Sequence, residues 1–451
     1  MAVITTTSKT LAPGRSYKNG NANKLQAVDE PVHDWYRFVL SFPPHLVEDY
    51  IKRFDLQPGQ TLLDPFCGTG TTLVTAKMRG IASVGIEANV MAHFASTVKV
   101  DWSVTPDALS EHARLVAECA AQKLAAQGIE DDPLFYLNSR VRSHLLRLDP
   151  EKEKLLLRDS ISPLPLHKTL VLLEALQQHQ HKTYHRHELL ALAKALVFAI
   201  SNLRFGPEVG IGKPKEDAPV LSAWLNEVDR MARDLAILQG GNDAKVIVHL
   251  ADAREIFSLL KPNSIDAVIT SPPYPNEKDY TRTTRLESVL LGFINNHAEL
   301  RALKRRLVRS NTRTVYKGDS DDQWIAGHPE IQRLAHAIEQ RRIELGKTSG
   351  FERLYGRVTK LYFGGMARHL AELRRALKPG AQLAYVVGDQ ASYLRVMIRT
   401  GQLLADIAQS LGYEVAGIDL FRTRLATATR EQLREEVVVL KWPGKKTDLA
   451  S

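Results

Sequence analysis

An alternation of short apolar strands and amphipathic helices limits the fold of this chain more than any other feature. The segments TLLD (61–64) and SVGIE (83–87) each end on an acid, and each is followed by a helical pattern, TTLVTAKMR and NVMAHFASTV. Strands separated by helices pair in parallel, because the connection has to cross over the sheet. The alternation returns with KVIVHLAD (245–252), IDAVIT (265–270) and AQLAYVVGD (381–389). These segments predict an α/β fold with a mostly parallel sheet.

The last two predicted strands differ from the others. EVAGIDLF (414–421) and EEVVVLKW (435–442) are separated by a polar run and by no apolar helix. Two strands joined in this way are typical of an antiparallel edge on a mixed sheet. The sequence therefore predicts a mixed, mostly parallel sheet with an antiparallel edge.

Two long stretches interrupt the strand and helix rhythm. Residues 103–240 show successive amphipathic helical patterns, and residues 285–358 combine helices with loops. The 451 residues would suffice for two or three separate domains of about 100–200 residues each, but one core with two largely helical insertions explains the same length. The expected organisation is a flexible N-terminal arm (1–32), core segments (33–102, 241–284 and 359–445), helical insertions (103–240 and 285–358) and a short tail (446–451).

Composition excludes several classes of protein. The two cysteines are too few for a disulfide framework or a four-cysteine zinc site, and no apolar run is long enough to span a membrane. The N-terminus lacks the apolar segment of a signal peptide, which predicts a cytoplasmic protein. Lysine and arginine together exceed the acids by 60 to 51, a net charge of +9 that is compatible with a polyanionic partner.

The turn after the first strand, DPFCGTGTT (64–72), has the composition of a nucleotide-binding loop. Gly68 and Gly70 permit backbone torsions and close approaches that a side chain would block, and Thr71 and Thr72 can cap the helix whose amides face a ligand. A leucine stands where a dinucleotide fingerprint needs a third glycine, so a nucleoside without phosphates fits better. The alternative is a strand-to-helix turn that binds nothing.

The second motif is TSPPY (270–274), directly after a predicted buried strand. Pro272 and Pro273 cannot extend a central strand and carry no N–H donors, so they leave carbonyl groups facing outward. The hydroxyl of Ser271 and the carbonyl of Pro272 can accept the two N–H bonds of a planar amine, while the ring of Tyr274 stacks on its face. The alternative for an isolated PPY is a turn with a buried tyrosine, and the nearby glycine loop argues against it.

Taken together, DPFCGTGTT and TSPPY resemble the amino-group DNA methyltransferases, especially the cytosine-N4 enzymes. The resemblance implies a Rossmann-like class I methyltransferase fold and S-adenosyl-L-methionine as cofactor. The segment SFPPHLVEDYIKRF (41–54) resembles the part of the family that closes over the methionine. The cofactor-binding residues implied are Asp64, Pro65, Phe66, Gly68, Gly70, Thr71 and Thr72 on the methionine-side loop, Glu87 at the ribose and Asp252 near the adenine.

The resemblance also implies the reaction. Ser271, Pro272, Pro273 and Tyr274 are the predicted catalytic residues, acting on a base flipped out of double-stranded DNA. Serine at the start of the motif favours cytosine N4 over adenine N6, and a cognate restriction enzyme is a possible partner. The competing hypotheses are an RNA-base or protein-glutamine methyltransferase, and a non-catalytic nucleic-acid-binding protein that kept the fold.

Three further patterns bear on the chemistry. The segment RALKRRLVRSNTRTVYK (301–317) has seven basic residues and no acid, so it predicts phosphate contact, with a solvated helix face as the alternative. Neither Cys67, inside the glycine loop, nor Cys119, in the first insertion, suits the nucleophile that carbon-5 methylation needs. The histidines between 179 and 187 lack the cysteines or carboxylates that would complete a metal site, so no metal is expected.

Overall fold

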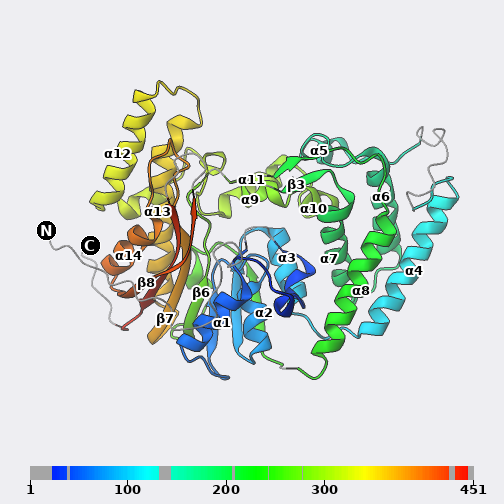
Figure 1. Ribbon diagram of the computed structural model, residues 1–451, viewed down its shortest axis with the longest axis horizontal. Coiled ribbons are helices and arrows are strands. Elements are labelled where there is room, and N and C mark those ends of the chain that lie inside the picture. The colour runs from blue at the N-terminus through cyan, green and yellow to red at the C-terminus, as the bar shows by residue number, and fades with distance from the viewer. Residues whose placement is uncertain are drawn as a thin grey trace.

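The computed structural model describes residues 23–37, 41–131, 144–205, 209–241, 243–276, 278–425 and 432–444. Its centre is a seven-stranded sheet in the order β5-β2-β1-β6-β7-β9-β8 (Figure 1). The first five strands of this order pair in parallel, and β9 is antiparallel to both of its neighbours. The strands are β1 (Thr61–Asp64), β2 (Ala82–Glu87), β5 (Val246–Leu250), β6 (Ile265–Thr270), β7 (Leu377–Gly388), β8 (Glu414–Leu425) and β9 (Gln432–Lys441). The predicted mixed sheet with an antiparallel edge is confirmed.

Helices cover both faces of this sheet, because successive side chains of each buried strand point to opposite faces. Leu62 packs in the cluster formed with α1 (Pro44–Arg53) and α2 (Thr71–Met78). Its neighbour Leu63 packs in the cluster formed with α13 (Tyr355–Leu373) and α14 (Thr400–Ser410). The core is therefore a three-layer α/β structure, as a Rossmann-like fold requires.

The first insertion forms a helical lobe beside the sheet (Figure 1). Its apolar core is shared with α3 (Val90–Lys99), the helix that leads from the sheet into the lobe. The helices of the lobe are α4 (Pro106–Ala125), α5 (Pro150–Glu153), α6 (Pro163–Gln178), α7 (His185–Ala195) and α8 (Val220–Leu238), with a π-helical turn at Leu196–Ile200. An antiparallel hairpin of β3 (Leu203–Phe205) and β4 (Val209–Ile211) lies among them. The sequence analysis did not predict this hairpin.

The end of the predicted N-terminal arm is packed against the lobe. Residues 1–22 lie outside the described part of the chain, but Val32 is fully buried and its N–H donates to Asp234 of α8 at 2.9 Å. The indole of Trp35 donates to the same carboxylate at 2.7 Å, and the hydroxyl of Tyr36 donates to Glu287. The segment 23–37 therefore contacts both the lobe and the second insertion. Val32, at the end of the predicted flexible arm, is part of this contact.

The second insertion follows the short helix α9 (Tyr280–Thr283). Its helices are α10 (Arg285–Leu290), α11 (His297–Arg306) and α12 (Pro329–Glu344), and the 3-10 turn η7 (Asp321–Ile325) packs against α13. Figure 1 shows α12 beside α13, and α9 to α11 between the sheet and the lobe. Within the described residues, no helix combines the length and apolarity needed to cross a membrane. The predicted tail, residues 446–451, lies outside the described part.

Candidate active site

The two sequence motifs meet at the carboxyl ends of adjacent strands. Leu62 of β1 pairs in parallel with Ala267 of β6, so the loops that follow these strands lie side by side. The hydroxyl of Thr270 donates to the Asp64 carboxylate at 2.6 Å, which joins the two strand ends directly. Since β2 lies on one side of β1 and β6 on the other, this is the switch point at which open α/β sheets bind ligands.

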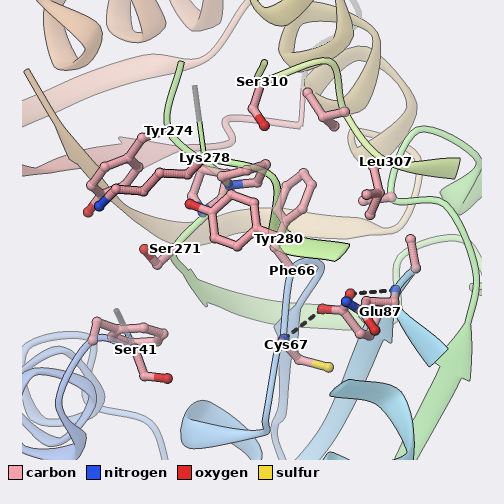
Figure 2. A pocket seen from close by; sticks show the side chains of 18 of the residues that line it. Ser41, Phe66, Cys67, Glu87, Ser271, Tyr274, Lys278, Tyr280, Leu307 and Ser310 are labelled. Atoms are coloured by element: carbon pink, nitrogen blue, oxygen red, sulfur yellow. Dashed lines mark hydrogen bonds between the residues drawn. The ribbon is translucent and has the colours of Figure 1, made fainter. Parts of the chain in front are cut away.

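The glycine loop is shaped by backbone torsions and by one carboxylate. Gly68 and Gly70 have φ values of 52° and 87°, which favour glycine, and Gly70 is the N-cap of α2. A Cβ on Gly70 would also lie 3.0 Å from the Cβ of Ser96. Glu87 accepts hydrogen bonds from the N–H of Gly68 at 2.8 Å and from that of Asn89 at 2.7 Å (Figure 2). The loop and the end of β2 are therefore held as one unit.

Burial changes the acidity of the two carboxyls at these strand ends. It raises the pKa of Glu87 to about 7, although the N–H groups of Asn89 and Gly68 stabilise the anion. It also raises the pKa of Asp64 to about 6, against the hydrogen bonds from Thr270 and Thr72. Both groups thus titrate closer to neutral pH than ordinary carboxyls.

A cavity of about 290 Å³ opens above the two loops. Most of the predicted site residues line it, namely Pro65, Phe66, Gly68, Thr71, Glu87, Asp252, Ser271, Pro272, Pro273 and Tyr274. Asp64, Gly70 and Thr72 do not line it. Thr72 donates to the carbonyl of Ile269 at 3.2 Å, and Asp64 accepts from the N–H of Phe66 at 3.1 Å. These three residues therefore stabilise the conformation of the glycine loop on the side away from the cavity.

The ring of Phe66 is supported from beneath the cavity. It meets His369 of α13 edge-on, with ring centroids 4.9 Å apart. Burial lowers the pKa of His369 to about 4, so the imidazole is neutral. Its Nδ1 lies 2.8 Å from the carbonyl of Ala253 and therefore carries the proton, which leaves Nε2 to accept from the hydroxyl of Tyr385 at 2.7 Å. Phe66 thus rests on a fully hydrogen-bonded support.

The SPPY loop is fixed by the strands that follow it in the sequence. The hydroxyl of Ser271 donates to the carbonyl of Val386 in β7 at 3.2 Å. The hydroxyl of Tyr274 donates to Glu435 of β9 at 3.1 Å, and burial together with the Glu435 charge raises the pKa of Tyr274 well above its ordinary value. The tyrosine ring packs on Gly388, where a Cβ would lie 2.9 Å from its Cε2.

The arrangement of Ser271 has a chemical consequence. A hydroxyl has one proton and two lone pairs, and the proton of Ser271 is directed to Val386. Its lone pairs are therefore available as acceptors for an N–H group. Figure 2 shows Ser271, Tyr274 and Tyr280 around the same cavity as Phe66 and Glu87.

Several residues of this cavity lie outside the two sequence motifs. Glu435 lies at the wall, and its other oxygen pairs with Arg422 of β8. Lys278 and Tyr280 follow the SPPY motif and also line the wall. Two sequence features lie within the strands that help to form this site. They are the acids at the start of EEVVVLKW in β9 and the glycine at the end of AYVVG in β7.

The basic segment 301–317 divides into two groups. Arg309 is buried and paired with Asp319, and Lys304 pairs with Asp279 at 2.8 Å. The other five basic residues, Arg301, Arg305, Arg306, Arg313 and Lys317, are exposed. Arg306 also lines the cavity. Two of the seven charges therefore stabilise the insertion, and the other five face solvent beside the site.

The cysteines and the histidines of the 179–187 segment differ in their distance from the cavity. Cys67 is a buried free thiol of the glycine loop and lines the cavity, whereas Cys119 is a free thiol on α4 of the lobe. His187 is buried with a ring nitrogen 3.0 Å from the carbonyl of Asp101, and His181 stacks on Tyr184. Among the described residues, no three His, Cys, Asp or Glu side chains converge as a metal site would need.

The described residues fit a nucleoside-bearing cofactor such as S-adenosyl-L-methionine. Glu87 offers a carboxylate at the end of β2, where ribose hydroxyls are bound in open α/β sheets. The loop places Gly68 and Thr71 at the cavity wall, and the buried hydroxyl of Thr69 there has no hydrogen-bond partner within the described structure. The apolar ring of Phe66 supplies a face for a base or a methionine chain.

A switch-point cavity of this kind, next to a loop of acceptors and an aromatic ring, is consistent with a Rossmann-like class I methyltransferase. Residues 10–94 match the N6/N4 family model described as "DNA methylase". The chain is 26% identical to the type II methyltransferase M.BsoBI of Geobacillus stearothermophilus, with 91% of this chain and 83% of that protein covered. It is 23% identical to M.AvaI of Nostoc sp., with 92% and 87% covered. The matched segment and the similarity to type II methyltransferases over most of the chain support an amino-group DNA methyltransferase family.

A third similarity is local. Over 56 residues, 12% of this chain and 10% of the relative, the chain is 43% identical to the type II methyltransferase M.MjaII of Methanocaldococcus jannaschii. The two longer alignments extend over most of the chain, so they include both insertions as well as the core.

Proposed function

We propose that this protein transfers a methyl group from S-adenosyl-L-methionine to the exocyclic amine of a base flipped out of double-stranded DNA, with cytosine N4 as the favoured target. One observation carries the proposal. The acceptors and ring of the SPPY loop share one cavity with Glu87 and the glycine loop. A nucleoside cofactor and a planar amine can therefore meet there.

The chain's contribution to the reaction is positioning. The lone pair of an exocyclic amine is delocalised into the base, so the nitrogen is a poor nucleophile until its N–H bonds are held out of plane. The Ser271 hydroxyl, whose own proton is used by Val386, and the Pro272 carbonyl accept these two bonds. Tyr274 stacks on the base and fixes its height above the loop.

S-Adenosyl-L-methionine, when bound, would supply an electrophilic methyl group and would leave as its thioether. The amine held by Ser271 and Pro272 would take the methyl group and give up one proton to water, so that the product is neutral. No side chain has to change its oxidation state or form a covalent bond to the base. Electrostatic complementarity and exclusion of water are the remaining contributions of the cavity.

The choice of base is the finer part of the proposal. Two acceptors and a ring fit the amine of cytosine or of adenine, and Ser271 at the head of the motif favours cytosine N4. Adenine N6 is the alternative, and an RNA base is a less favoured one. The relatives are named as type II methyltransferases, so a cognate restriction enzyme in the same cytoplasm is a further expectation.

The test uses methyl-labelled cofactor, the full chain and DNA, followed by analysis of the nucleosides. Labelled N4-methylcytosine is the expected product, and labelled N6-methyladenine would select the alternative. Ser271→Ala and Tyr274→Ala should each lower kcat by about 100-fold or more, with DNA binding retained. Label found only in RNA or protein, or no label at all, would contradict the proposal.

A further inference from the structure

Arg254 is a buried arginine two residues beyond Asp252, on the loop that follows β5. Its Nε donates to both oxygens of Asp252, at 2.9 and 3.1 Å, and its Nη2 contacts the same carboxylate. The backbone N–H of Arg254 donates to Asp252 at 2.9 Å as well. The orientation of the Asp252 carboxylate is therefore set almost entirely by one residue.

The other side of the guanidinium reaches the second insertion. Nη1 pairs with Asp321 of η7. Burial lowers the pKa of Arg254, but the hydrogen bonds and charges of Asp252 and Asp321 more than compensate, so the pKa lies above its ordinary value. The arginine remains a cation between two carboxylates from different parts of the chain.

Asp321 is itself placed by close backbone packing. A Cβ on Gly364 of α13 would lie 2.0 Å from the carbonyl oxygen of Asp321, so only glycine permits this approach of η7 to the helix. The Asp321 carboxylate also lies 3.4 Å from a guanidinium nitrogen of Arg368 on the same helix. The outer end of the Asp252–Arg254–Asp321 chain is thus anchored to the core.

Arg254 also contacts the end of α11. Its Nη2 donates to the carbonyl of Arg305 at 3.2 Å, and Arg309 donates to the same carbonyl at the same distance. Cationic donors stabilise the unpaired carbonyls at a helix C-terminus. The residues that come next, Arg306 to Val308, line the cavity.

We propose that Arg254 is a positioning residue for adenine recognition, which holds the Asp252 carboxylate toward the cofactor and is itself held by Asp321 of the second insertion. This inference rests on the proposed function, in which Asp252 lies near the adenine. A carboxylate has about four acceptor directions. The backbone N–H, Nε and Nη2 of Arg254 take about three of these directions. Asp252 lines the cavity, and in this proposal its one remaining lone pair accepts from the 6-amino group of a purine.

The experiment compares two ligands, S-adenosylhomocysteine and S-inosylhomocysteine, which differ by an amino group against a carbonyl at position 6 of the purine. Their affinities are measured by calorimetry for the full chain and for three variants. The wild type should prefer the adenosyl ligand by about tenfold or more. Arg254→Lys keeps the charge but loses the planar two-pronged contact, so this preference should largely disappear, and Asp321→Asn should reduce it.

Arg309→Lys is the matched control. Arg309 is buried and caps the same Arg305 carbonyl, but it pairs with Asp319 and does not contact Asp252. Its substitution should leave the preference between the two ligands unchanged. Thermal unfolding of each variant without ligand identifies loss of folding, and Asp321→Asn tests the inference should Arg254→Lys fail to fold.

The outcomes separate the inference from the proposed function. A wild-type protein that binds neither ligand contradicts the proposed cofactor. If the wild type binds both ligands and a folded Arg254→Lys keeps the preference, Arg254 does not position Asp252. If Asp321→Asn keeps the preference, Asp321 does not hold Arg254 for this purpose. An equal loss of preference in Arg309→Lys overturns the inference too, because the effect would then come from anchoring α11 alone.

Discussion

The hydroxyl of Thr270 donates to the carboxylate of Asp64 at 2.6 Å, and both side chains are fully buried. The two residues are 206 positions apart in the sequence. Each is the last residue of its strand, β6 or β1, and the SPPY loop and the glycine loop start immediately after them. This bond therefore sets the relative position of the two loops.

Thr270→Val should destabilise the protein by about 1–3 kcal/mol, because a buried carboxylate loses a hydrogen-bond donor. The pKa of Asp64 is raised from 3.8 to about 6. The contribution of Asp64 to stability is therefore present below pH 3.8 and lost as the pH rises through about 6. Since the Thr270 bond opposes this rise, the variant should lose more stability above pH 6 than in acid. Urea unfolding below pH 3.8 and above pH 6 measures the free energy of unfolding in the two ranges. Thr270→Ser, which keeps the hydroxyl, should resemble the wild type.

Gly388→Ala should impair the reaction without affecting the cofactor. The new Cβ would lie 2.9 Å from the Tyr274 ring, so the ring must move. A misplacement of about 1 Å at a well-ordered site costs about 100-fold in rate. The measurement is kcat for methyl transfer together with the affinity for S-adenosylhomocysteine. Gly417→Ala on neighbouring β8 is the control, since no atom lies within 4 Å of its Cβ. An unchanged kcat in Gly388→Ala would show that the ring position is not critical.

Cofactor affinity should fall as the pH is lowered through about 7. Burial raises the pKa of Glu87 to this value. Only the ionised form keeps a free lone pair on each oxygen for ribose hydroxyls beside the bonds from Gly68 and Asn89. Below the pKa, one oxygen of the carboxyl carries a proton. That oxygen is then a poorer acceptor, both for a ribose hydroxyl and for the N–H groups of Gly68 and Asn89. Calorimetric titration of S-adenosylhomocysteine across this range tests the expectation. Glu87→Gln should bind more weakly, with no pH dependence from this group; a wild-type curve equally flat would rule out Glu87 as the titrating contact.

The exposed charges of α11 should contribute to DNA binding in a salt-dependent way. Arg301→Gln should reduce the slope of log affinity against log salt by about 0.9, as expected for one lost phosphate contact, and by a similar amount for any DNA sequence. Lys304→Gln should mainly lower stability, since Lys304 pairs with the buried Asp279. Fluorescence anisotropy at several salt concentrations measures the slope. Lys52→Gln on α1 provides a control, and an Arg301→Gln slope equal to it would exclude contact by this residue.

The parts of the fold that local patterns specify were predictable from the sequence. Strand period and helix period change sharply at TLLD, SVGIE and IDAVIT, and those segments became β1, β2 and β6. The glycines of the glycine loop were recognisable because positive φ values restrict residue choice at a turn. Local chemistry was sufficient for these features.

Features that depend on pairing between distant segments were not predictable. The contact of Tyr274 with Glu435 requires the register of β9 against β7, where Gly388 pairs with Glu435, and no local pattern determines that register. The local sequence gives no signal for the role of Arg254, because its partners Asp321 and the Arg305 carbonyl are distant in the chain. The β3–β4 hairpin was missed because its strands have three residues each and lie among glycines and a proline.

The position of the first insertion between adjacent strands has a consequence for folding kinetics. The chain leaves the sheet after β2 and returns as β5, which pairs directly with β2, so the lobe is a long loop whose two ends meet. Closing a long loop is slow when the loop is unstructured. Because α4, α6, α7 and α8 pack together within one apolar cluster, early collapse of the lobe would bring those ends together and speed the docking of β6 beside β1. Loss of the lobe's packing should therefore appear first as slow recovery of ligand binding at the cavity during refolding.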